Sequence, residues 1–161
     1  MKKILFICLG NICRSSMAQG ILQAELNRRG IFDIEVDSAG TGSWHIGNQP
    51  DSRAIETAAR HNIDISGQRA RQVSQADFND FDLVIAMDAD NFADLEHLQP
   101  SENSQQLAQK LAMCLQFDKA STLRDVPDPY YGDQDGFEHV MTILKDACHG
   151  IADHITSTSA Q

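Results

Sequence analysis

The stretch KILFICLGNICRS, residues 3–15, determines the fold of this 161-residue chain. Residues 3–8 form a short apolar run that stops before Gly10, which is typical of a strand buried on both faces. The loop that follows leads to Ser15 or Ser16, where a helix can begin. A buried strand joined to a helix in this way is the first unit of a parallel α/β sheet.

The helix expected after the loop has one apolar face and a recognisable end. Arg28 and Arg29 suit the negative C-terminal end of a helix, and Gly30 suits the position just beyond it. The apolar face consists of residues at helical spacing: Met17, Ala18, Ile21, Leu22 and Leu26.

Strand and helix patterns continue to alternate along the chain. Residues 34–38 predict a second strand, and Asp51 can cap a helix that runs to about Asn62. Residues 83–87 predict a third strand, followed by a helix at about 90–98. Residues 111–115 are a candidate fourth strand, although they could equally end the preceding helix. From Gly136 onward, apolar residues three and four positions apart predict a long helix: Phe137, Val140, Met141, Leu144, Ala147, Cys148, Ile151 and Ile155.

This order of elements predicts an α/β fold. We expect a four-stranded parallel sheet with helices on both faces, a flavodoxin-like three-layer sandwich. Because no repeat or linker divides the chain, we expect a single domain over residues 1–156 and a frayed tail at 157–161.

The charge of the chain excludes some classes of function and points to one region. With 13 Lys and Arg against 23 Asp and Glu, the net charge is −10 at pH 7. Such a protein is a poor general binder of nucleic acid or anionic membranes. Residues 1–30 differ, because they carry five basic residues and one acidic residue, Glu25. We therefore expect an anion to bind near the N-terminus.

The sequence predicts a cytoplasmic protein with reduced thiols. The apolar run at residues 4–9 is too short for a signal peptide, and no stretch reaches the roughly 20 apolar residues of a membrane span. The four cysteines are too few for a secreted disulfide framework: Cys8, Cys13, Cys114 and Cys148.

The loop from Cys8 to Ser15 has the features of an anion site. Gly10 and Asn11 tolerate the left-handed backbone of a curled loop whose N–H groups point inward, and Arg14 can hold two oxygens of a tetrahedral anion. The same positive field would stabilise a Cys8 thiolate, to which Ser15 could donate a hydrogen bond. Ligands of parallel sheets bind where strands end, as this loop requires. The alternative is an ordinary turn with Cys8 as a small buried core residue.

Five segments in the same order resemble the low-molecular-weight protein tyrosine phosphatases. CLGNICRS resembles the signature loop of that family, and residues 38–41, 70–72, 81–88 and 126–132 resemble its later markers, the last being its acid loop. The resemblance covers nearly the whole chain. It implies hydrolysis of phosphotyrosine and small aryl phosphates through a cysteinyl-phosphate intermediate, with protein tyrosine and inorganic phosphate as products.

The resemblance also implies the catalytic roles. Cys8 would be the nucleophile and Arg14 would bind the phosphoryl oxygens. The residues alone leave Asp125, Asp128 and Asp133 as candidate proton donors, and the resemblance selects Asp128. The phosphate-binding loop would comprise Leu9, Gly10, Asn11, Ile12, Cys13, Arg14 and Ser15. No metal or cofactor is expected, because the loop donors offset the charge.

Other residues receive supporting roles from the resemblance. Trp44, Tyr130 and Tyr131 would form the walls that hold the substrate ring, although peripheral packing is the simpler interpretation for either tyrosine alone. Cys13 would form a reversible disulfide with the nucleophile, or else be an inert small residue. Cys114 and Cys148 are expected to be core thiols.

Two positions depart from the pattern of the family. Ser16 stands where a proline is usual, so we expect a slightly looser first helical turn. Gln68 stands where many relatives have histidine, in a supporting hydrogen-bond network that would also include Asn11, Ser15 and Ser38.

Three alternative functions fit less well. A thiol-coupled arsenate reductase needs further cysteines near the third strand, and none lies between Cys13 and Cys114. A non-catalytic phosphate-binding module should lack the nucleophile or the acid. A thioredoxin-like role needs two residues between the cysteines, whereas four separate Cys8 from Cys13. The expected partner is a tyrosine-phosphorylated protein, for example an autophosphorylating tyrosine kinase, and the expected state is a monomer or weak dimer that binds neither nucleic acid nor membrane.

Overall fold

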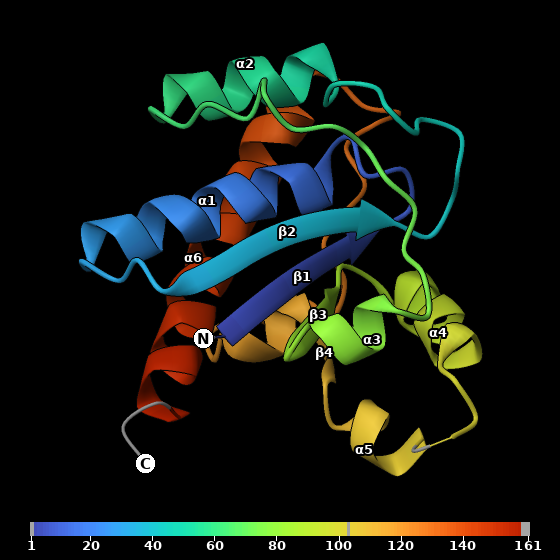
Figure 1. Ribbon diagram of the computed structural model, residues 1–161. Helices are drawn as coiled ribbons and strands as arrows, with labels where there is room; N and C mark the ends of the chain where they lie inside the picture. Colours follow the sequence, from blue (N-terminus) through green and yellow to red (C-terminus); the bar gives the residue numbers. More distant parts are fainter. Residues whose placement is uncertain (1, 103, 159–161) are drawn as a thin grey trace.

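Strand β1 (Lys2–Cys8) lies inside a parallel sheet and pairs with a strand on each side. The computed structural model describes residues 2–102 and 104–158. In this part of the chain the strand order is β2-β1-β3-β4, in which β2 is Ile34–Gly40, β3 is Leu83–Ala86 and β4 is Leu111–Met113 (Figure 1). The four-stranded parallel sheet predicted from the sequence is therefore confirmed.

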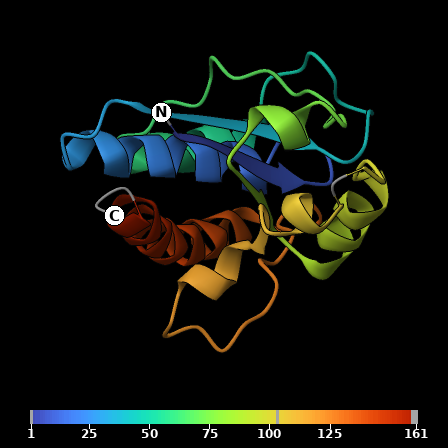
Figure 2. The ribbon, with the colours of Figure 1, turned by 60° about the horizontal axis from the view of Figure 1, so that its bottom comes forward.

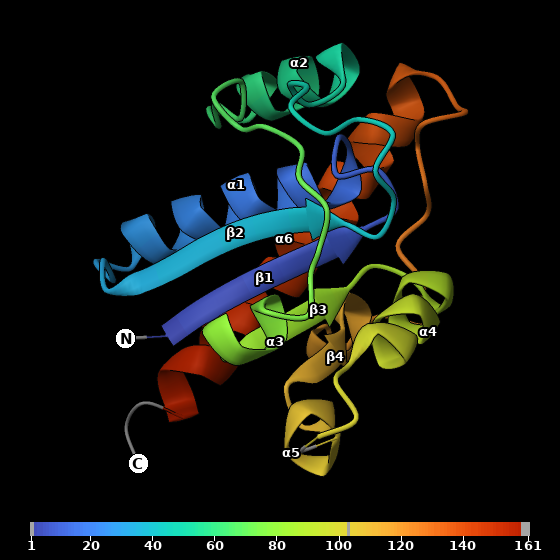
Figure 3. The same cartoon turned by 45° about the vertical axis from the view of Figure 1, so that its right-hand side comes forward.

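Side chains of β1 alternate between two separate apolar clusters. Ile4 and Phe6 pack with α1 (Arg14–Arg28), α2 (Ser52–Arg60) and α6 (Gln134–Ser157). Leu5 and Ile7 pack on the other face, with α3 (Asp77–Asp80), α4 (Ala89–Leu98) and α5 (Ser104–Ala108). Figure 2 shows α1 and α6 lying side by side, and in Figure 3 α6 runs behind the strands. Helices cover both faces, which confirms the three-layer arrangement.

The predicted elements agree with the structure to within a few residues at their ends. Helix α1 begins at Arg14, one residue before Ser15, and β2 continues to Gly40. The segment at 111–115, which the sequence left open as a strand or a helix end, begins as β4 and continues as a 3-10 helix, η1 (Cys114–Phe117). Helix α6 ends at Ser157 and Thr158 follows it, so the predicted tail begins inside the helix, and residues 159–161 lie outside the described residues. The predicted apolar faces of α1 and α6 are buried throughout.

Local capping explains where several helices begin and end. Asp51 accepts a hydrogen bond from the backbone N–H of Arg53 at the start of α2, as its sequence position predicts. Gly30 has a φ of 73° just beyond α1, and the N–H of Ile31 reaches back to the carbonyl of Leu26. This geometry closes α1 and turns the chain toward β2.

The sheet places the ends of β1 and β3 side by side at a reversal of strand order. From β1, the chain adds β2 on one side and then β3 on the other. Crevices at such a reversal are the usual ligand sites of parallel sheets. The loop after β1 begins at Cys8, and the loop after β3 begins at Met87. Among the described residues, no helix combines the length and the apolar character needed to cross a membrane.

Candidate active site

The loop between β1 and α1 turns its carbonyl groups outward. The carbonyls of Cys8, Leu9 and Ile12 accept hydrogen bonds from the N–H groups of Thr41, Gly42 and Asp51, at 3.0, 2.9 and 2.8 Å respectively. The carbonyl of Asn11 accepts from the Ser16 hydroxyl, and that of Cys13 accepts from a backbone N–H of α1. In a trans peptide the N–H points away from the carbonyl. The N–H groups of the next residues therefore face the interior of the loop, where an anion can bind.

Two residues make this curl possible. Asn11 has a φ of 57°, in the left-handed region that asparagine tolerates. Gly40 at the end of β2 lies directly against the loop, because a Cβ there would be 2.7 Å from the carbonyl oxygen of Leu9. A larger residue at position 40 would push the loop away from the sheet.

A chain of hydrogen bonds that runs both ways from Asn11 reaches the Cys8 sulfur at one end. The Ser38 hydroxyl donates to Gln19 Oε1 at 2.6 Å and accepts from Asn11 Nδ2 at 2.9 Å. Asn11 Nδ2 also donates to Ser15 Oγ at 2.8 Å, and Ser15 Oγ lies 3.0 Å from Cys8 Sγ. Ser15 Oγ accepts from the Asn11 amide and still has its own hydrogen, which it can donate to the sulfur. The N–H of Asn11 adds a second donor to Cys8 Sγ, at 3.3 Å.

Arg14 is buried beneath the loop with negative groups around it. Its Nη1 lies 2.6 Å from Asp88 Oδ2 and donates to the carbonyl of Val126 at 3.0 Å, while Nη2 lies 3.5 Å from Asp128 Oδ2. Burial alone would lower the pKa of Arg14, but Cys8, Asp88 and Asp128 outweigh it and raise the pKa. The guanidinium therefore stays charged beside the Cys8 sulfur.

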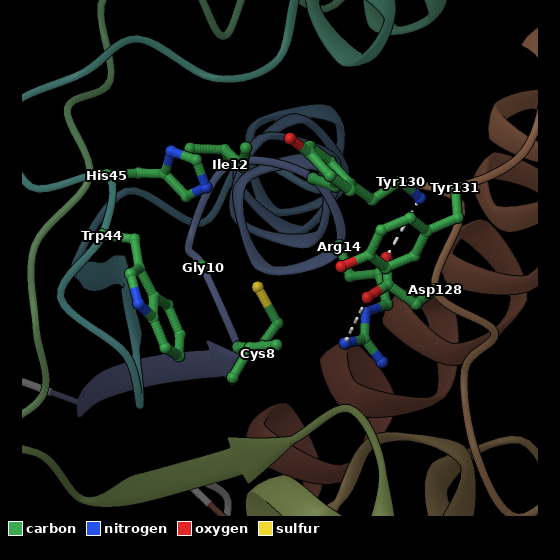
Figure 4. A pocket seen from close by; sticks show the side chains of 11 residues that line it. Cys8, Gly10, Ile12, Arg14, Trp44, His45, Asp128, Tyr130 and Tyr131 are labelled. Carbon is green, nitrogen blue, oxygen red and sulfur yellow. Dashed lines mark hydrogen bonds and ion pairs between the residues drawn. The ribbon is translucent and has the colours of Figure 1, made fainter.

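The loop forms the floor of a cavity of about 260 Å³. Figure 4 shows the Cys8 sulfur at its base, with Trp44 and His45 on one side and Asp128, Tyr130 and Tyr131 on the other. The lining residues are Cys8, Leu9, Gly10, Ile12, Cys13, Arg14, Trp44, His45, Asp128, Tyr130 and Tyr131. The structure thus brings together the predicted nucleophile, arginine, acid and aromatic residues, which come from three separate segments of the chain.

Asp128 is held between Arg14 and its own loop. Its Oδ1 accepts from the backbone N–H of Tyr130 at 3.1 Å, and Oδ2 faces Arg14. About a third of the side chain is exposed. Of the three candidate acids, Asp128 lines the cavity, whereas Asp125 accepts from the N–H of Ala89 and Asp133 caps α6.

The aromatic residues stand open at the mouth of the cavity. Trp44 is 71% exposed and Tyr131 is 89% exposed. The Tyr130 and Tyr131 rings meet edge to face, with centroids 5.0 Å apart, and His45 lies 6.4 Å from Tyr130. Apolar rings that are exposed here leave their faces available to a flat ligand.

Cys13 is a buried thiol in the same cavity. Burial first, and then the charges of Asp51 and Cys8, raise the pKa of Cys13, so it stays protonated at neutral pH. The Cys8 sulfur has different surroundings, because Ser15 Oγ and the N–H of Asn11 lie within hydrogen-bond distance of it. Burial also raises the pKa of Cys114 to about 12, and both Cys114 and Cys148 are fully buried, as expected of core thiols.

One expectation about the support of the loop is corrected, and Ser16 makes a contact that the sequence did not predict. Gln68 Nε2 donates to the carbonyl of Ser16 at 3.0 Å, and among these described residues no hydrogen bond joins Gln68 to Asn11, Ser15 or Ser38. Gln19 of α1 takes the place expected for Gln68 as the partner of Ser38. Ser16 also does more than replace a proline, because its hydroxyl donates to the Asn11 carbonyl and ties the first turn of α1 to the loop.

Sequence reasoning missed three residues of the site. Gln19 lies four positions after Ser15, a spacing that places two side chains on one helix face. Asp88 lies directly after β3, at the sheet edge where polar residues converge. His45 adjoins Trp44 and has no sequence signal of its own. The described residues contain no group of three or more His, Cys, Asp or Glu side chains placed to hold a metal ion.

The fold and the site define an α/β protein with a buried thiol and a buried arginine at the two ends of the loop between β1 and α1. The family model for low molecular weight phosphotyrosine protein phosphatases matches residues 3–160, and the chain belongs to that family.

Individual relatives agree with this assignment. The chain is 42% identical to the low molecular weight protein-tyrosine-phosphatase YfkJ of Bacillus subtilis over 92% of each chain. It is 39% identical to low molecular weight phosphotyrosine protein phosphatase 1 of Drosophila melanogaster, over 92% of this chain and 93% of that one. A crystal structure of a protein tyrosine phosphatase from Entamoeba histolytica superimposes with a TM-score of 0.92 at 35% identity, covering 99% of each chain. The protein is a low molecular weight protein tyrosine phosphatase, an enzyme that hydrolyses phosphotyrosine.

Proposed function

We propose that this enzyme hydrolyses phosphotyrosine in two steps that both pass through Cys8. In the first step the Cys8 thiolate attacks phosphorus, so that an S–P bond forms while the bond from phosphorus to the tyrosine oxygen breaks. Asp128 gives its proton to the departing phenolate. In the second step water attacks phosphorus and Asp128 takes the proton of that water. The S–P bond breaks, which releases inorganic phosphate and the Cys8 thiolate.

The hydrogen-bond chain that ends at Cys8 is the observation that carries this proposal. Ser15 Oγ, 3.0 Å from the sulfur, is positioned to stabilise a thiolate both before attack and as the leaving group of the second step. The N–H groups around the sulfur would bind the oxygens of the transferred phosphoryl group. Arg14 would bind the same oxygens with its two-pronged guanidinium. Because these groups offset the charge, we expect full activity in the presence of a chelator.

The walls of the cavity support phosphotyrosine as the substrate class. An aromatic ring can enter between Trp44 on one side and the two tyrosines on the other (Figure 4), and Leu9 and Ile12 also line the cavity. A phosphoserine side chain is shorter and lacks the ring that these walls would contact. We therefore expect phosphotyrosine peptides to be cleaved faster than phosphoserine peptides of the same sequence.

Two variants test the mechanism. Cys8→Ser should abolish hydrolysis of p-nitrophenyl phosphate at mildly acidic pH, and retained turnover would exclude the covalent intermediate. Asp128→Asn should slow substrates with poor leaving groups by about a hundredfold or more, and p-nitrophenyl phosphate much less. Equal losses on both kinds of substrate would remove Asp128 from the role of acid.

A redox role for Cys13 belongs to the same proposal. Peroxide would oxidise Cys8 to a sulfenic acid, and the Cys13 sulfur would displace water from it to form a disulfide that a thiol reductant reverses. Cys13→Ser should make the loss of activity after peroxide less reversible. Identical recovery in both proteins would rule the disulfide out.

The physiological setting is proposed on the same chemistry. The substrate would be a tyrosine-phosphorylated protein, with an autophosphorylating tyrosine kinase as one candidate, met in the cytoplasm by a monomer or weak dimer. A pull-down with Cys8→Ser, which binds substrate without turning it over, would identify the partner. Release of the captured protein by orthophosphate would show that it occupies the active site.

A further inference from the structure

Arg53, on the first turn of α2, connects two loops of the active site. Its Nε and Nη2 donate to the two carboxylate oxygens of Asp51, at 3.0 and 2.9 Å. Its Nη2 also donates to the carbonyl of Tyr130 at 3.0 Å, and its Nη1 donates to the carbonyl of Gly132 at 3.1 Å. The guanidinium stacks over the buried ring of Phe137, with its carbon 4.7 Å from the centroid.

These contacts hold Tyr130 in place, and Tyr130 in turn orients Asp128, the proposed acid. The N–H of Tyr130 donates to Asp128 Oδ1, and the carbonyl of the same residue is held by Arg53. The segment from Asp118 to Asp133 has no regular helix or strand to keep it rigid. Before Asp128, the segment is attached to the loop after β3, because the N–H of Val126 donates to the Met87 carbonyl. After Asp128, Arg53 supplies the attachment.

The other end of the connection reaches the phosphate-binding loop. The N–H of Asp51 donates to the carbonyl of Ile12 at 2.8 Å, while the Asp51 side chain holds Arg53 and caps α2. A continuous path of bonds therefore runs from Ile12 through Asp51 and Arg53 to Tyr130 and Gly132. The nucleophile loop and the acid loop are joined outside the cavity that the substrate would occupy.

We propose that Arg53 is a positioning residue that holds the acid loop in register with the phosphate-binding loop. This inference rests on the proposed function, because it requires Asp128 to be the proton donor. Arg53 does not line the cavity, and the structure engages its N–H groups with Asp51, Tyr130 and Gly132. It therefore acts through Asp128 and not on the phosphoryl group. The planar fork matters as much as the charge, because three partners in different directions must be reached at once.

The test compares Arg53→Gln and Arg53→Lys on two substrates that differ in their need for a proton. We expect both variants to slow hydrolysis of a phosphotyrosine peptide by about tenfold, because a displaced acid transfers its proton poorly. Hydrolysis of p-nitrophenyl phosphate, a far better leaving group, should change much less. The inhibition constant of orthophosphate should stay the same, because Arg14 and the loop amides are unchanged.

A double variant separates positioning from general damage. In an Asp128→Asn background, Arg53→Gln should cause no further loss on the phosphotyrosine peptide, because the group it positions is already gone. A matched control is Arg60→Gln, on the same helix, whose partner Glu138 lies on α6 away from the site. That variant should turn over both substrates normally, and thermal unfolding of all variants verifies that they are folded.

The outcomes distinguish failure of the inference from failure of the mechanism. Equal losses on both substrates for Arg53→Gln, or a full further loss in the double variant, would overturn the role of Arg53. A normal rate for Arg53→Lys would also overturn the requirement for the planar fork. If Asp128→Asn itself shows no difference between the substrates, then the proposed acid is wrong, whatever Arg53 does.

Discussion

Arg14 lies 2.6 Å from Asp88 at the start of α4, although the two residues are 74 positions apart. The second oxygen of Asp88 accepts from the N–H of Asn91 at 2.8 Å and caps the helix. The cap fixes the carboxylate, and the carboxylate fixes the guanidinium beside the loop that runs from Cys8 to Ser15. Arg14 is thus already oriented for its proposed role, and substrate binding energy need not be used to order it.

Asp88→Asn should lower kcat by about tenfold without raising KM, measured with p-nitrophenyl phosphate. The variant loses the charge that orients Arg14, which costs rate. The variant also lacks a negative charge close to the expected position of the substrate phosphate. Because repulsion of the phosphate is then weaker, substrate should bind at least as tightly. Asp90→Asn, an exposed neighbour in the same helical turn, makes the same change in net charge and should leave both constants as they are. A proportional rise in KM would show that Asp88 supports substrate binding instead.

Gln19→Leu should lower kcat by a few-fold, because it removes the acceptor at the far end of the hydrogen-bond chain to Cys8. Ser38 then loses its fixed orientation, and Asn11 is held less firmly. Burst kinetics with p-nitrophenyl phosphate would measure both chemical steps. Gln23→Leu on the same helix, where the amide bonds to exposed Asn27, is the matched control. Equal rates for both variants would show that the chain beyond Ser38 has no effect on the nucleophile.

The Gln19 contact also shows where sequence reasoning reached its limit. Local patterns were enough for β1, for the loop from Cys8 to Ser15 and for the apolar faces of α1 and α6, because these depend on neighbours in sequence. Whether Gln19 or Gln68 reaches Ser38 depends on the distance between α1 and the segment after α2. No local pattern encodes that distance.

The partners of Arg14 and Arg53 could not be predicted from the sequence for the same reason. Asp88, Tyr130 and Gly132 meet these arginines only after strands and helices have packed, and two of the contacts use backbone carbonyls that any residue supplies. Helices α3 and α5 were missed because they have four and five residues, too few to show a periodic pattern.

Gly150→Ala should destabilise the protein by about 1–3 kcal/mol, although alanine normally favours a helix. A Cβ at position 150 would lie 1.9 Å from the carbonyl oxygen of Phe117, so η1 and α6 would have to separate. Gly136→Ala in the same helix is the control, because the nearest atom to its Cβ would be a side-chain carbon at 3.9 Å. Urea unfolding of the two variants would measure the contrast. Equal stability of the two variants would mean that η1 and α6 can move apart with little loss of folding free energy.

Glu25→Gln should lose stability at neutral pH and lose less as the solution becomes acidic. Hydrogen bonds from Arg28 and then Arg29 lower the pKa of Glu25 from 4.5 to about 2. A depressed pKa in the folded state means that the ionised carboxylate stabilises the fold above pH 4.5, and that this contribution disappears as the pH falls toward 2. We expect a difference of about 1 kcal/mol at pH 7 after allowing for solvent screening.

The measurement is the free energy of unfolding in urea at pH 7, 5, 4 and 3, for the native protein and the variant. The gap between them should be constant from pH 7 to 5 and should narrow below that. Glu56→Gln, at an exposed carboxylate on α2, controls for the loss of one negative charge and should show no gap at any pH. A gap at pH 3 as large as that at pH 7 would mean that Glu25 stabilises the junction of α1 and α6 by packing, and that its charge contributes nothing.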